Sequence, residues 1–104
     1  MGTKLTPEAE GLYQAILQLK TKDECRALFA DLCTEREISE MARRLAVAVM
    51  LRSGRRYTEI SSETGASSAT ISRVANCLNY GAGGYRDVLS RLEKDESDKD
   101  GDGV

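Results

Sequence analysis

The sequence predicts an all-α protein of about six helices. Apolar residues recur at spacings of three and four, no stretch alternates apolar and polar residues for long enough to form a strand, and several segments open with helix-start patterns. The chain has 104 residues, 40% hydrophobic and 31% charged, which is typical of a single soluble domain. A lone chain of this length buries only about 60–70% of its unfolded surface. This size is compatible with association with a second chain.

Two amphipathic helices are expected in the first third of the chain. The first begins after Thr6, because Pro7 suits the first position of a helix. The second is opened by a capping box, in which Thr21 and Glu24 can each bind a backbone N–H of the first turn. The stripe of the first helix is Leu12, Tyr13, Ile16, Leu17 and Leu19, and that of the second is Cys25, Leu28, Phe29 and Leu32.

A third helix is expected from a second capping box, Thr34 with Glu37, to about Arg52, with Gly54 just past its end. Its middle, residues 45–51, is apolar on every side. Such a helix must be covered all round, and the other short helices of one chain can hardly do so. This pattern predicts an intertwined homodimer, the alternative being a central helix wrapped by its own chain.

Shorter helices follow, at residues 57–64, 67–80 and 85–92. Gly65 supplies a left-handed residue between the first two, and three further glycines separate the last one. We therefore expect a helical domain over residues 1–93, followed by an acidic, flexible tail over residues 94–104.

The charges are sorted along the chain. The net charge is −2, yet residues 41–80 carry six arginines against two glutamates, a net +4. An all-arginine basic segment suits a polyanion because arginine binds phosphate through two parallel hydrogen bonds. A solvated helix face is the other interpretation of the same charges.

Several function classes are excluded. The chain has no histidine, which removes histidine-dependent triads and metal sites. Its three cysteines form no CxxC pair, and core packing is their expected role. Residues 98–103 match only the first half of a calcium loop, because the chain ends before the twelfth position. We therefore expect no enzyme, no metal site and no cofactor.

Two short helices joined by a glycine-containing turn are typical of a DNA-binding helix-turn-helix. The second helix opens with small side chains, which would let its N-terminal end enter the major groove. Hydroxyl and amide groups can hydrogen-bond base edges there, and an alanine can contact a thymine methyl. The predicted base-reading residues are Ser67, Ser68, Ala69, Ser72 and Asn76. The predicted phosphate contacts are Arg52, Arg55, Arg56, Tyr57, Thr70 and Arg73. A plain helical hairpin with serine caps is the alternative.

The run Gly65-Ala66-Ser67-Ser68-Ala69-Thr70-Ile71-Ser72-Arg73 resembles the tryptophan repressor superfamily. Together with Cys33-Thr34-Glu35-Arg36-Glu37-Ile38 and the segment 74–81, it is similar to the TrpR-like YerC/YecD family, over about residues 8–92. The resemblance implies an intertwined, all-helical homodimer with a helix-turn-helix on each subunit, acting as a transcriptional regulator.

The resemblance also implies an effector pocket. Residues that match the pocket of tryptophan-binding relatives are Thr34, Arg44, Thr70 and Arg73. These relatives have a glycine where this chain has Val74, and the segment between Gly54 and Gly65 is one residue shorter here. An isopropyl group at this position should occupy the space of the indole. We therefore predict that tryptophan is not the corepressor; another effector, or pairing of Arg44 and Arg73 with acids such as Glu40, remains open.

The sequence predicts a cytoplasmic transcriptional regulator, expected to be a repressor, that binds operator DNA sequence-specifically as a dimer. No apolar run approaches the length of a membrane span, and residues 1–6 lack the core of a signal peptide. The alternative is a helical adaptor module that docks an acidic partner protein through its arginines, Arg43, Arg44, Arg55 and Arg56.

Overall fold

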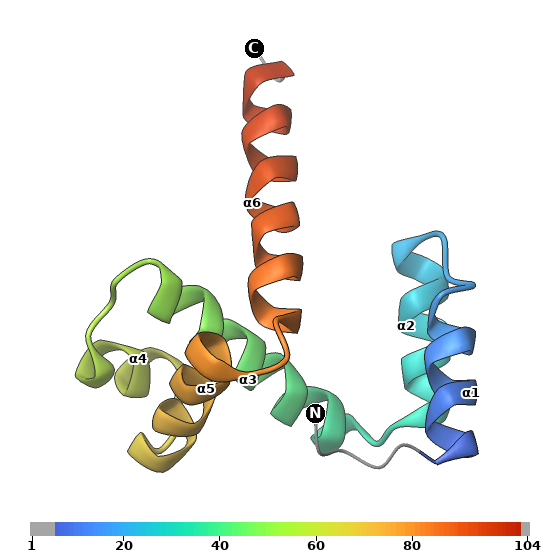
Figure 1. Cartoon of the computed structure of the whole chain (residues 1–104), viewed down its shortest axis with the longest axis horizontal. Coiled ribbons are helices and arrows are strands. Elements are labelled where there is room, and N and C mark those ends of the chain that lie inside the picture. Colours follow the sequence, from blue (N-terminus) through green and yellow to red (C-terminus); the bar gives the residue numbers. More distant parts are fainter. Residues whose placement is uncertain (1–5, 103–104) are drawn as a thin grey trace. The chain divides into compact units, whose positions relative to one another are not determined.

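The computed structural model describes residues 6–102, and side chains through Glu96. Within this part of the chain the secondary structure consists of six helices (Figure 1). They are α1 (Pro7–Ile16), α2 (Lys22–Leu32), α3 (Glu35–Arg52), α4 (Tyr57–Thr64), α5 (Ser68–Tyr80) and α6 (Gly84–Asp102). The prediction of an all-α fold of about six helices is confirmed.

Residues 1–40 and 41–104 form two compact units. In the first unit, the predicted caps are present. The Thr6 hydroxyl accepts from Ala9 N at the start of α1, and the Thr21 hydroxyl accepts from Glu24 N at the start of α2. The Glu24 carboxylate accepts from Lys20 N at 2.7 Å, one residue before the N-cap Thr21 whose N–H a capping box would use. At α3, the Thr34 hydroxyl accepts from Glu37 N, and the Glu37 carboxylate accepts from Thr34 N.

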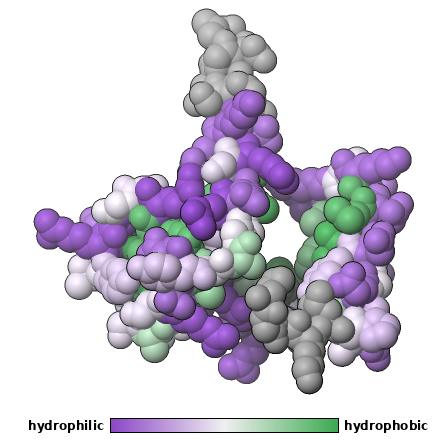
Figure 2. Space-filling model, viewed as in Figure 1, coloured by the Kyte–Doolittle hydropathy of each residue, from purple (hydrophilic) through white to green (hydrophobic). Residues whose placement is uncertain are grey.

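The apolar stripes of α1 and α2 are only partly covered within the described chain. Neither helix contains a buried residue. Helix α1 also ends earlier than its stripe predicts, at Ile16, so that Leu17 and Leu19 lie beyond it and Leu17 is largely exposed. In the space-filling view, green apolar surface is visible on the part of the molecule formed by α1 and α2 (Figure 2). A single chain therefore buries these predicted stripes only in part.

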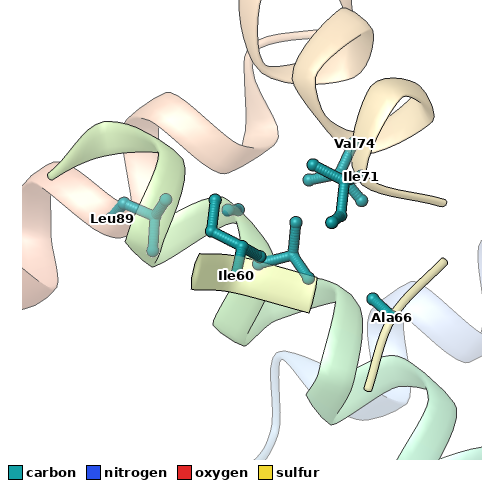
Figure 3. Close-up of a cluster of buried hydrophobic side chains, with 7 residues drawn as sticks. Ile60, Ala66, Ile71, Val74 and Leu89 are labelled. Carbon is teal, nitrogen blue, oxygen red and sulfur yellow. The ribbon is translucent and has the colours of Figure 1, made fainter. Parts of the chain in front are cut away.

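The hydrophobic core lies in the second unit. It consists of Val47, Ala48, Ile60, Ala66, Ile71, Val74 and Leu89. These residues come from α3, α4, the following turn, α5 and α6, and Ile60 of α4 points toward its neighbours from α5 (Figure 3). Helix α5 packs against both α4 and α6. The core thereby fixes the helix-turn-helix segment on the end of α3.

The middle of α3 is covered on one side only. Val47 and Ala48 are fully buried, and Met50 and Leu51 pack against the core. Leu45 and Val49 remain 39% and 45% exposed. A groove of about 270 Å³ between α3 and α6 is lined by apolar side chains from both helices and by two glutamates, namely Val49, Leu89, Leu92, Glu93 and Glu96.

Helix α6 is longer than the sequence predicts. The apolar spacing predicts an end near Leu92, whereas the helical backbone continues to Asp102. The partial calcium motif falls at residues 98–103, whose side chains lie outside the described residues. The predicted flexibility of the segment 94–104 therefore stays a prediction.

Candidate nucleic-acid interface

Helices α4 and α5 are joined by a three-residue turn, Gly65 to Ser67. Gly65 has a φ of 75°, in the left-handed region, and its N–H donates to Ser61 O at 2.9 Å. This conformation ends α4 and turns the chain sharply toward α5. The helix bounds and the left-handed glycine agree with the sequence prediction.

Two hydroxyls fix the turn, and both were missed at the level of sequence. The Ser61 hydroxyl donates to Ala66 O at 2.9 Å, and the Thr64 hydroxyl accepts from Ala66 N at 3.1 Å. Ala66 itself is buried in the core. Both polar backbone atoms of a buried turn residue are thus satisfied by α4. The serine and threonine content of α4 was the available signal.

Ser67 is the N-cap of α5. Its hydroxyl accepts from Thr70 N at 3.1 Å and lies 3.1 Å from the Thr70 hydroxyl. The cap fixes the first turn of α5, leaving the exposed side chains of Ser68 and Ala69 at its N-terminal end. Ser67 therefore acts first as a structural residue of the motif, and Thr70 is half-buried beside it.

The remaining predicted base-reading residues share one face of α5. Ala69, Ser72 and Asn76 follow each other at spacings of three and four, and all three are exposed. The opposite face carries Ile71 and Val74, which are buried in the core. The exposed face of α5 thus consists of short side chains, one apolar and two polar, and the opposite face is packed in the core.

Val74 is only 2% exposed. It lies beside Ile71 on α5 in the core cluster that also contains Ile60 and Val47 (Figure 3). Its isopropyl group therefore fills a place in the packed interior of the second unit.

The predicted phosphate-binding arginines are in different environments. Arg52 donates to both carboxylate oxygens of Glu93 on α6, at 2.9 and 3.0 Å, and approaches the Ser90 hydroxyl at 3.4 Å. These hydrogen bonds raise the pKa of Arg52 and lower the pKa of the Glu93 carboxyl. The guanidinium of Arg52 is thereby directed to α6.

Arg55 lies between two carboxylates of α4. One guanidinium nitrogen is 3.6 Å from Glu59, and another is hydrogen-bonded to Glu63. Glu59 also accepts from Arg56 N at 3.0 Å, at the start of α4. The side chains of Arg56 and Arg73 are exposed, and Tyr57 is half-exposed in the first turn of α4. The acidic partners Glu59, Glu63 and Glu93 were not anticipated, although the spacing 55–59–63 is a signal for such pairs.

The predicted effector residues divide between the two units. Thr34 lies in the first unit, where it caps α3 and its hydroxyl also contacts Glu37 at 3.2 Å. Arg44, Thr70 and Arg73 lie in the second unit, with both arginines exposed. Among the described residues, no group of three or more acidic or cysteine side chains is arranged to hold a metal ion.

Comparison with known proteins identifies the family. The family model described as Trp repressor protein matches residues 8–93, nearly all of the helical chain. The chain belongs to the Trp repressor family. The likeness predicted from residues 33–38 and 65–81 is thereby confirmed.

Individual relatives agree with this membership. The uncharacterized protein YerC of Bacillus subtilis (strain 168) is 50% identical over 91 residues, which is 88% of each chain. A solved TrpR-like protein from Eubacterium eligens ATCC 27750 is 51% identical, covers 85% of this chain and 91% of its own, and superposes with a TM-score of 0.81. A second solved structure, from Staphylococcus aureus, is 42% identical over 86% of this chain and 89% of its own, with a TM-score of 0.80.

The Trp repressor family is a family of regulators, which agrees with the expectation of a non-enzymatic protein. Within the described residues, no helix is both long enough and apolar enough to span a membrane.

Proposed function

We propose that the protein is a transcriptional regulator that binds operator DNA through α4 and α5. The observation that carries the proposal is the exposed face of α5. Ala69, Ser72 and Asn76 form a surface of short side chains, two of them polar, on a helix whose opposite face packs in the core. Such a face fits the major groove, where bulky side chains would prevent close approach to base edges.

Two exposed arginines of the motif support the same function. Arg56 immediately precedes α4, and Arg73 lies on α5 next to Ser72; both side chains are exposed. Phosphate contacts by arginine fix the register of a helix-turn-helix on the duplex and supply most of its sequence-independent affinity. Membership of a regulator family points in the same direction.

We also propose that the DNA-binding form is a homodimer in the cytoplasm. Helices α1 and α2 bury no residue in the described chain, and Leu45 and Val49 of α3 are substantially exposed. Apolar stripes at helical spacing are stable only when something covers them. A second copy supplies matching stripes from the same helices, and it would also place two α5 helices on one duplex.

Tryptophan is not the effector in this proposal. Val74 stands where the resemblance implies a glycine beside the ligand, and its side chain is packed in the core. A bicyclic indole cannot share space with a packed isopropyl group unless neighbouring side chains shift, which typically costs about 1–3 kcal/mol. Thr34, Arg44, Thr70 and Arg73 therefore have no assigned small-molecule partner here.

Salt-dependent binding of a random-sequence duplex tests the proposal. Fluorescence anisotropy should show binding that weakens steeply between about 50 and 200 mM salt. Arg56→Gln should weaken binding and lower the salt slope by about one, because one phosphate contact is lost. Arg26→Gln, an exposed arginine of α2, is the matched control and should leave binding unchanged. A protein that binds no duplex at low salt contradicts the proposal and favours the adaptor alternative.

A further inference from the structure

Arg55 is a predicted phosphate contact of the proposed DNA-binding surface, and it forms ion pairs with two carboxylates. Glu59 and Glu63 are the acidic residues of the segment 41–80, and both contact the same arginine. That arginine lies just before α4, at the edge of the motif, with about a third of its side chain exposed. Both negative charges of the segment, which are already counted in its net charge of +4, therefore lie at Arg55.

The negative charge of Glu63 does not stabilise α4. It lies next to the last residue of α4, near the C-terminal end, where the helix dipole disfavours a negative charge. Glu59, in contrast, lies in the first turn and caps the helix by accepting from Arg56 N. The Glu63 carboxylate instead accepts a hydrogen bond from the Arg55 guanidinium. The two acids therefore differ in their roles, although both approach one guanidinium.

A guanidinium that is hydrogen-bonded to a carboxylate cannot give the same donors to a phosphate. For Arg55 to contact DNA through the nitrogen that donates to Glu63, one anionic partner must be exchanged for another. A contact through its other N–H groups would bring the phosphate close to the Glu63 carboxylate. The net gain from such an exchange is much smaller than that from an arginine facing solvent. Arg56, whose side chain is exposed, does not carry this cost.

We propose that Glu63 competes with DNA phosphate for Arg55 and thereby limits the sequence-independent affinity of the protein. The inference rests on the proposed DNA-binding function and adds an affinity-setting residue to it. Its physical effect is to leave a larger share of the binding free energy to the polar face of α5. The pair Arg52–Glu93 is less suitable for a test, because it also joins α3 to α6.

Glu63→Gln is the informative variant, because it removes the charge and keeps the size. We expect it to tighten binding of a random-sequence duplex about two- to fivefold at low salt, the range that corresponds to an exposed ion pair. The salt slope should become steeper by up to about one, since Arg55 becomes available to a phosphate. Thermal unfolding of the variant should be close to that of the parent protein, because the side chain is half-exposed.

A double-mutant cycle separates this competition from a general change of charge. In an Arg55→Gln background, Glu63→Gln should have little effect on affinity, since the guanidinium for which Glu63 and phosphate compete is absent. The competition proposal is overturned if Glu63→Gln tightens binding equally in both backgrounds, or in neither. The proposed DNA-binding function is independent of that result. It stands if the parent protein binds duplex and Arg56→Gln weakens that binding. Absence of duplex binding by the parent protein and by all variants overturns both proposals.

Discussion

Exposed side chains of the helix-turn-helix segment fall into two chemical groups. Arg56 and Arg73 carry charge, whereas Ser72 and Asn76 carry hydrogen-bonding groups on short chains. Phosphates are the same at every base pair, while base edges differ. The two groups should therefore contribute to different properties of DNA binding, affinity in the first case and sequence preference in the second.

Substitutions can separate these contributions. Arg73→Gln should weaken binding to all duplexes alike and reduce the salt slope by about one. Ser72→Ala or Asn76→Ala should instead change the preference at one base pair by about 1–3 kcal/mol. Selection of bound sequences from a random pool, followed by affinity measurements at two salt concentrations, checks both expectations. The division between phosphate and base contacts is wrong if all three variants behave alike.

Val74 allows a second test at the level of a single residue. Val74→Gly removes three carbons from the core and places glycine inside α5, so we expect it to lower the free energy of unfolding by roughly 3 kcal/mol. Calorimetry with the unmodified protein should show no saturable binding of tryptophan. Saturable binding, or a rise in melting temperature at millimolar tryptophan, would restore the corepressor hypothesis.

At the scale of the elements, the sequence predicts the helices well because their signals are local. Thr21 with Glu24 and Thr34 with Glu37 fix two helix starts within a few residues, and the observed bounds follow them. Gly65 similarly fixes the end of α4. The end of α6 lacks such a signal, because no capping residue follows Leu92 and the charged residues beyond it favour helix as readily as coil. The length of α6 could therefore not be predicted.

Contacts between elements were harder to predict than the elements. Glu93 follows Arg52 by 41 positions, so the ion pair depends on the packing of α6 against α3, which no sequence spacing reports. The contact of Glu63 with Arg55 is different, because the spacing 55–59–63 is itself a signal for such a pair. The polar face of α5 was predictable, because periodicity alone separates Ile71 and Val74 from the exposed positions.

The turn between α4 and α5 gives a prediction for a backbone conformation. Gly65→Ala should cost about 1–2 kcal/mol, because an alanine in the left-handed region is strained even though no atom lies within 4 Å of the added Cβ. Gly84→Ala is the matched control, since its surroundings are equally open and its φ is not positive. Chemical denaturation of both variants checks the difference. Equal stability of the two variants would show that Gly65 is not required by its backbone geometry.

The ion pair between Arg52 of α3 and Glu93 of α6 predicts that the free energy of unfolding depends on pH. Since the pKa of the Glu93 carboxyl is lowered in the folded protein, its ion pair contributes stability above the ordinary carboxyl range. That contribution is lost as the pH falls through the lowered pKa. The difference in free energy of unfolding between the parent protein and Glu93→Gln should therefore be present at neutral pH and disappear in acid. A difference that is constant with pH contradicts this role for Glu93.

At the scale of the whole molecule, the described chain buries its apolar residues unevenly. All seven core residues belong to the second unit, and α1 and α2 bury none. The sequence predicts apolar stripes on these helices, but the spacing of apolar residues does not indicate whether the same chain or a second chain covers them. The exposed positions of α3 and the groove beside α6 add further apolar surface. The first unit is therefore expected to be stable only in an assembly.

The location of the subunit interface gives the last prediction. Light scattering at micromolar concentration should give about twice 11.4 kDa for the parent protein. Val49→Asp should reduce this mass, because Val49 is 45% exposed in the single chain and a charge there would be buried without a partner in the dimer. Val47→Asp is uninformative, since Val47 is fully buried in its own chain and the variant would unfold in any assembly. Ser39→Asp, at an exposed polar position of α3, is the control and should keep the dimer mass. A folded monomer of the parent protein contradicts the dimer, and an unchanged mass for Val49→Asp contradicts the proposed place of its interface.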